Sequence, residues 1–150
     1  MTYIIYLAIQ LILNNPTALA QEAYVNDKSN IVVHVTNIEN MEGEILVGIY
    51  DSKKTFRKIK KVFKYAIQPV ENGQEVIVIE DVPSGQYAIA LFQDVNGNRK
   101  FDTNFMGVPK EPFGFSTNYV VKRRAPKFNE VLFEHGGNQD TEMTIDMQEW

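Results

Sequence analysis

Short stretches in which apolar and polar residues alternate follow one another along the chain from about Ser29 onward. They are rich in β-branched and aromatic residues and are bounded by turn residues, which is typical of β-strands, and no stretch keeps a helical period over three turns. The pattern predicts seven strands, at residues 31–36, 45–50, 62–67, 75–82, 86–92, 130–134 and 142–147. Strands at this spacing favour an all-β protein, an antiparallel two-sheet β-sandwich of the immunoglobulin-like kind.

Turn residues and flanking prolines predict how some of these strands are placed. The segment Asn40–Gly43 indicates a hairpin turn between the first two strands. Pro69 closes the third strand and favours an edge position for it, because proline cannot donate a hydrogen bond to a neighbouring strand. Residues 86–92 are apolar on both faces, which indicates a central strand.

A long segment from Asp94 to about Pro126 has no strand pattern. Loops of this length in compact domains are usually functional or disordered. The part from Gly107 to Ser116 combines prolines, glycines and aromatic residues, so we expect this loop to be ordered.

The start of this loop has the spacing of a calcium site. Oxygen-bearing side chains stand at relative positions 1, 3, 5 and 9, and the helix-loop-helix calcium motif uses the same offsets together with a backbone carbonyl at position 7. The candidate ligands are Asp94, Asn96, Asn98, Lys100 (through its carbonyl) and Asp102. Position 6 is Arg99 instead of glycine, and position 12 is Phe105 instead of glutamate. The alternative is that these residues only form turns, since Asp and Asn hydrogen-bond to their own backbone there.

Three residues further along are candidates for a ligand groove. Phe113 and Phe115 would form its floor, with Glu111 as the polar contact. The alternative is that the two aromatic side chains pin the long loop onto the sheet.

The N-terminus resembles a signal peptide. The apolar run Tyr3–Leu13 precedes Ala18-Leu19-Ala20, a small-x-small triplet that signal peptidase accepts. We therefore expect residues 1–20 to be removed and residues 21–150 to form a single exported domain, periplasmic or extracellular. No Lys or Arg occurs before Lys28, which leaves a buried N-terminal strand or an uncleaved anchor as the alternative.

The composition of the chain argues against several kinds of partner and site. The 150 residues carry a formal net charge of −4, and this excess of acidic over basic residues argues against a nucleic-acid partner. A basic cluster lies between Lys53 and Lys64, and we interpret it as a solvated connection or a one-turn helix, with an anion or membrane-surface patch as the alternative. There is no cysteine, which excludes disulfides, thiolate metal sites and a cysteine nucleophile.

No catalytic constellation is recognisable. The two histidines, His34 and His135, fall in or at the end of predicted strands, and neither lies in a known motif. We expect a binding or structural module and no enzyme. The alternative is a small secreted hydrolase or carbohydrate-active enzyme that would use the loop carboxylates Asp94, Asp102 and Glu111.

One stretch carries a family resemblance. Residues 82–116, VPSGQYAIALFQDVNGNRKFDTNFMGVPKEPFGFS, resemble the signature of the exported bacterial family known as domain of unknown function 2141, and the likeness extends over about the whole mature chain. In that family the strand before the loop tends to end in His-Asp, where this chain has Gln93, and a second glycine often stands at the position of Arg99. The Pro83–Tyr87 turn also resembles prealbumin-like and carboxypeptidase-regulatory-like sandwiches. The resemblance implies export, a β-sandwich and an accessory, structural or binding role. As the partner of such a module we expect an envelope protein or a glycan.

Overall fold

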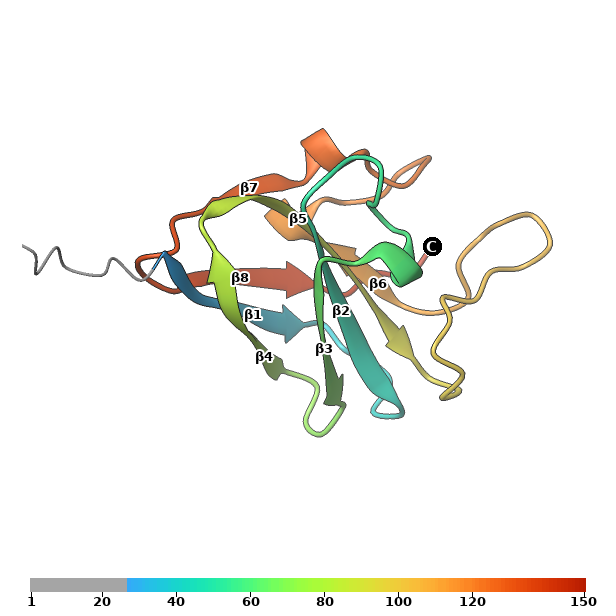
Figure 1. The fold of residues 1–150 in the computed structure, drawn as a ribbon. Helices are drawn as coiled ribbons and strands as arrows, with labels where there is room; N and C mark the ends of the chain where they lie inside the picture. Colours follow the sequence, from blue (N-terminus) through green and yellow to red (C-terminus); the bar gives the residue numbers. More distant parts are fainter. Residues whose placement is uncertain (1–26) are drawn as a thin grey trace, which may run out of the picture.

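The computed structural model describes residues 27–150, so the predicted signal peptide lies outside the described residues. Within them the chain forms eight strands and short 3-10 helices (Figure 1). The strands are β1 (Lys28–Thr36), β2 (Glu44–Tyr50), β3 (Lys64–Pro69), β4 (Glu75–Pro83), β5 (Gly85–Asp94), β6 (Phe113–Phe115), β7 (Leu132–His135) and β8 (Thr141–Asp146). The 3-10 helices are η2 (Ile59–Lys61), η3 (Ser116–Asn118) and η4 (Phe128–Glu130).

The strands form two sheets, which confirms the predicted β-sandwich. One sheet has three strands in the order β4-β1-β8, and the other has five, in the order β3-β2-β5-β6 with β7 also paired to β5. The edge position of β3 and the central position of β5 are as predicted. No helix within the described part of the chain has the length and apolar character needed to cross a bilayer.

The main core lies between the two sheets. Alternate residues of β1 and β2 face inward, and Ile31, Val33 and Ile45 are fully buried there. The predicted alternation along these strands is therefore the alternation between core and outer face. β5 is buried on both faces: Ile89 belongs to the main core, whereas Phe92 belongs to a second apolar cluster.

The second cluster covers the outer face of the five-stranded sheet. Connecting segments between β2 and β3 and between β6 and β7 lie over this face and supply part of its apolar residues. Its buried members are Tyr50, Phe56, Ala88, Phe92, Phe113, Phe115, Phe128 and Val131. The candidate site is an opening in this layer.

The predicted hairpin at Asn40–Gly43 is wrong. β1 pairs with β4 in antiparallel and with β8 in parallel orientation, so the segment instead carries the chain from one sheet to the other. The Gln93 side chain holds the crossing by donating hydrogen bonds to the carbonyls of Asn40 and Glu42, both at 2.7 Å. The hairpin prediction failed because the alternation of apolar and polar residues identifies a strand but does not specify its partner. The parallel pairing of β1 with β8 also departs from the purely antiparallel sandwich that was predicted.

The long segment after Asp94 is less irregular than predicted. β6 lies within it and pairs with β5, and Phe113 also exchanges backbone hydrogen bonds with Gln148 near the C-terminus, at 3.0 and 2.9 Å. The Ser116 hydroxyl accepts from the Ile89 amide at 2.9 Å and donates to the Val131 carbonyl at 2.5 Å. A three-residue strand is too short for its periodicity to be recognised in the sequence.

Candidate functional site: an apolar groove on the outer face of the five-stranded sheet

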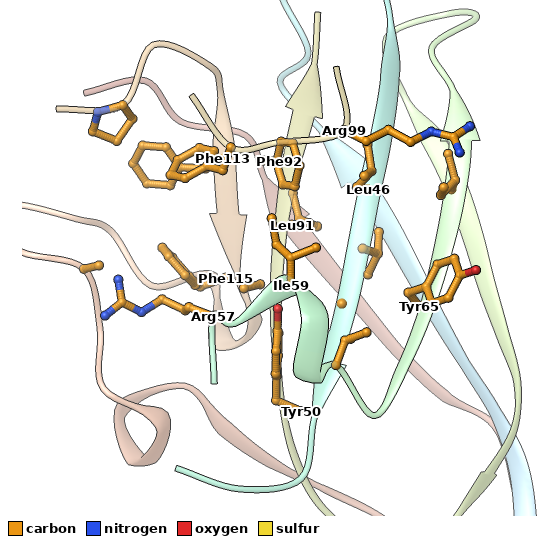
Figure 2. Close-up of a pocket in the computed structure, with 18 of the residues that line it drawn as sticks. Leu46, Tyr50, Arg57, Ile59, Tyr65, Leu91, Phe92, Arg99, Phe113 and Phe115 are labelled. Carbon is orange, nitrogen blue, oxygen red and sulfur yellow. The ribbon is translucent and has the colours of Figure 1, made fainter. Parts of the chain in front are cut away.

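A groove of about 420 Å³ opens on the outer face of the five-stranded sheet (Figure 2). Its floor comes from outward-facing residues of the two central strands, among them Leu46 and Tyr50 of β2 and Ala90 and Phe92 of β5. Because side chains alternate along a strand, these residues share the face opposite the main core. The volume lies within the roughly 300 to 1,000 Å³ that is usual for small-molecule sites.

Aromatic side chains form one wall of the groove. The rings of Phe92, Phe101, Phe113 and Phe115 follow one another with centroid separations of 5.4, 6.0 and 5.8 Å. Neighbouring rings at these distances stabilise one another, so the wall is a preformed surface. The other walls include Ile59, Val62, Val121, Ala125, Pro109 and the C-terminal Trp150.

Two guanidinium groups and the phenols of Tyr50 and Tyr65 add polarity to this apolar lining. Arg57 lies at the groove with its guanidinium carbon 5.9 Å from the centroid of the Phe56 ring. Burial raises the pKa of the Tyr50 hydroxyl, and the positive charge of Arg57 acts in the opposite direction. Arg99, at another part of the rim, is paired with Glu44 at 3.3 Å. An anion at the groove would therefore be bound most favourably beside Arg57.

The surroundings of Arg57 are strongly basic. No Asp or Glu occurs between Asp51 and Glu71, and the segment between them carries seven cations. Five of its lysines are exposed: Lys53, Lys54, Lys58, Lys60 and Lys61. The predicted one-turn helix is present here as η2. This segment gives one side of the groove a positive potential on a protein whose formal net charge is −4.

The structure brings together two of the three predicted groove residues. Phe113 and Phe115 line the groove from β6. Glu111 does not line it and is 5% exposed. Its Oε2 accepts a hydrogen bond from the Asp102 amide at 3.0 Å, while its buried Oε1 has no partner. Burial, together with the negative charges of Asp102 and Asp94, raises the pKa of Glu111. The hydrogen bond from the Asp102 amide acts in the opposite direction but does not cancel this rise.

The predicted calcium ligands share one loop, but their side-chain atoms bind one another and the loop backbone. Asp94 is fully buried, and its carboxylate accepts from the amides of Asn98 at 3.1 Å and Arg99 at 2.6 Å. Asp102 Oδ2 accepts from the amide groups of Asn96 at 2.8 Å and Asn98 at 2.7 Å, and these bonds lower the pKa of Asp102. The side-chain oxygen of Asn98 accepts from the Lys100 amide at 2.7 Å. This is the hydrogen-bonded turn that the alternative interpretation describes.

Two further observations concern metal binding and the two histidines. Between residues 27 and 150 no three His, Cys, Asp or Glu side chains are close enough to hold a metal ion. Of the two histidines, His34 faces Glu142 at 3.6 Å on the outer side of β1. His135 is 2% exposed and hydrogen-bonds through its ring nitrogens to Thr141 at 2.7 Å and to the Val82 carbonyl at 3.0 Å.

Sequence reasoning missed most of the groove. Leu46, Tyr50, Arg57 and Trp150 were not among the predicted site residues, although all four line it. One signal was available, because Leu46 and Tyr50 are apolar or aromatic at positions that alternate with the core residues of their strand. An outer sheet face that is apolar must be covered or must bind something.

Comparison with known proteins places the chain in a family. The comparison with curated proteins gave no match, and neither did the comparison with solved structures. The model of one family matches residues 33–144, which span both sheets, the groove floor and the Asp94–Asp102 loop. The chain therefore belongs to the DUF2141 family, described as an uncharacterized protein conserved in bacteria.

Proposed function

We propose that the protein is an exported, non-catalytic binding module whose groove holds a small amphipathic ligand with an apolar body and an anionic head. One observation carries the proposal: an apolar groove of about 420 Å³ lies open on the sheet, with Tyr50 on its floor and Arg57 in its lining. A long-chain carboxylate or a similar apolar monoanion has this chemistry.

The lining supports an apolar ligand body. Aromatic and aliphatic side chains from β2, β5 and β6 would exclude water from a bound chain, and each buried methylene would contribute about 0.8 kcal/mol. A glycan, with its many hydroxyl groups, would leave these groups without hydrogen-bond partners along the same wall.

The charges support an anionic head. Arg57 belongs to the stretch of seven cations without a carboxylate, so its neighbours reinforce its attraction for an anion. A guanidinium presents a planar pair of donors to a carboxylate or phosphate. The head would lie beside Arg57 and the body along the aromatic wall.

The test uses Trp150, the single tryptophan of the chain, which lines the groove. The mature protein is titrated with dodecanoate, with dodecanol and with dodecylamine while the tryptophan emission is followed. We expect saturable changes in the emission, with the affinity highest for dodecanoate, lower for dodecanol and lowest for dodecylamine. No saturable change with any of the three would overturn it.

Two variants sharpen the test. Ala90→Phe places a ring on the groove floor and is expected to abolish binding of all three ligands, because the added volume occupies their space. Arg57→Gln is expected to remove the preference for dodecanoate over dodecanol, whereas Arg123→Gln, at an exposed position outside the groove lining, retains it. Equal preference in both arginine variants would contradict the role of Arg57.

Calcium binding by the Asp94–Asp102 loop is a second candidate. The observation in its favour is the backbone of Arg99, which has a positive φ of 56° at the position where the helix-loop-helix motif needs glycine for its sharp turn. Binding would require the Asn96 and Asn98 amides to turn their oxygens toward the ion. Calorimetric titration with calcium, repeated with Asp94→Ala, tests this, and absence of heat in the unsubstituted protein would overturn it.

A further inference from the structure

We propose that the hairpin at residues 102–110 is a membrane-contact element that inserts Phe105 and Met106 into the surface of an anionic bilayer. The hairpin projects from the sandwich beside β6 (Figure 1). Phe105 is 96% exposed and Met106 is 70% exposed at its tip. Together these two adjacent side chains form an exposed apolar patch, and contiguous apolar patches mark sites of contact with a protein or a membrane.

Hydrogen bonds fix the conformation of the hairpin. Asn104 organises it: its side-chain oxygen accepts from the amides of Met106 at 2.9 Å and Val108 at 3.0 Å. The Asn104 backbone pairs with Val108 and Gly107 at 2.8 and 2.9 Å, and a bridge between Thr103 and Pro109 closes the base. The two apolar side chains are thus held outward by the backbone, so little conformational entropy is lost when they bind.

The charges around the tip fit an anionic surface. Residues 96–110 contain three cations, Arg99, Lys100 and Lys110, and a single carboxylate, Asp102. Arg99 is paired with Glu44 at 3.3 Å, so the exposed Lys100 and Lys110 are the cations of this segment that would meet an anionic surface. The basic segment between β2 and β3 lies on another side of the same groove, since Ile59 and Arg57 line the groove together with Phe101 and Pro109 at the base of the hairpin. Both cationic segments therefore flank the groove, where they would face the headgroups of an anionic bilayer.

A bilayer fits the tip better than a protein partner does. A stable protein interface needs about 800 Å² on each side, with a central apolar region, whereas this tip offers two apolar side chains on a narrow convex turn. An aromatic and an aliphatic side chain of this kind lie favourably at the boundary between headgroups and acyl chains.

The inference is independent of ligand binding in the groove. Phe105 and Met106 do not line the groove, so the groove-filling variant Ala90→Phe is expected to leave the tip unchanged. Vesicle binding that survives in Ala90→Phe, together with loss of dodecanoate binding, separates the two proposals. Failure of one leaves the other standing.

The experiment measures cosedimentation of the mature protein with vesicles of equal parts phosphatidylcholine and phosphatidylglycerol, and with vesicles of phosphatidylcholine alone. We expect binding to the mixed vesicles that weakens with salt, and about tenfold or more weaker binding for the double variant Phe105→Ser, Met106→Ser. The matched control is Val120→Ser, which removes an apolar side chain that is 67% exposed elsewhere on the surface, and it should bind like the unsubstituted protein. A second reporter, Phe105→Trp in a Trp150→Phe background, should shift its emission to the blue on vesicle addition.

Three results would overturn the inference. The first is absence of binding to the mixed vesicles. The second is equal binding by the double variant. The third is a concentration-dependent dimer that the double variant abolishes, because this would assign the tip to a second copy of the chain.

Discussion

The ring of Tyr50 lies across Gly48, two positions earlier on β2, so that a Cβ at Gly48 would stand 3.1 Å from the Tyr50 hydroxyl oxygen. The same Cβ would be 3.1 Å from a methyl group of Val62. Residues two apart on a strand share a face, so the missing side chain at position 48 is what lets the Tyr50 ring lie along the groove floor.

Gly48→Ala is expected to alter the groove more than the stability. Tyr50 and Val62 both line the groove, so they can yield by the few tenths of an ångström that the methyl group needs, and the free energy of unfolding should change by about 1 kcal/mol or less. The displaced Tyr50 ring should weaken dodecanoate binding measured by tryptophan emission. Unchanged affinity would mean that Tyr50 does not shape the site.

Gly114→Ala tests the same substitution in a closed environment. A Cβ at Gly114 would come within 2.6 Å of a methyl group of Ile145 and 3.1 Å of Leu91, both in the main core. Overpacking of this kind should lower the free energy of unfolding by about 1 to 3 kcal/mol in chemical denaturation. The control Gly136→Ala, whose Cβ would meet only the end of the Asn138 side chain, should have a much smaller effect.

Ser116→Ala should destabilise the outer layer of the fold. The buried hydroxyl serves both the Ile89 amide and the Val131 carbonyl, and its removal leaves both without that partner. The expected loss is about 1 to 3 kcal/mol in the free energy of unfolding. An unchanged denaturation midpoint would show that these two groups find other partners.

Asp94→Ala should destabilise the protein through the loop backbone. The buried carboxylate accepts from two backbone amides; alanine would remove this acceptor from the Arg99 amide and would leave the Asn98 amide only the side-chain oxygen of Asn96, at 3.1 Å. The expected cost is about 1 to 3 kcal/mol. Asn96→Ala removes a side chain from the exposed part of the same loop and should cost less. Equal losses, measured by thermal unfolding in chelator, would contradict this ranking.

Glu111→Gln should raise stability at neutral pH. The pKa of Glu111 in the folded state is raised above the ordinary value of 4.5, mainly by burial, so its charged form is disfavoured by folding. The penalty is complete above the raised pKa and disappears as the pH falls toward 4.5. The variant should therefore have the higher unfolding midpoint at pH 7, and this advantage should shrink on acidification.

The control for this pH dependence is Glu42→Gln, at an exposed position. It should leave the pH profile of the unfolding midpoint close to that of the unsubstituted protein. A lower midpoint for Glu111→Gln at pH 7 would mean that the charged carboxylate is stabilised by a contact, for example with a bound cation.

The sequence by itself determined the all-β class and most strand positions. Alternation is a local property, so the sequence indicates that Ile31, Val33 and Val35 share one face of a strand, and the structure shows that this face is the buried one. The central position of β5 followed from its two apolar faces, and the edge position of β3 followed from Pro69.

Only the tertiary structure decided how the strands pair and where the groove lies. β1 pairs with β8, more than a hundred residues later, and no local pattern specifies such a partner. The groove unites Leu46, Arg57, Phe113 and Trp150 from four separate segments. The shape of the groove depends on which connecting segments fold back over the outer face of the sheet. Packing between distant parts of the chain decides this, because each apolar residue on that face is buried only when the others are in place.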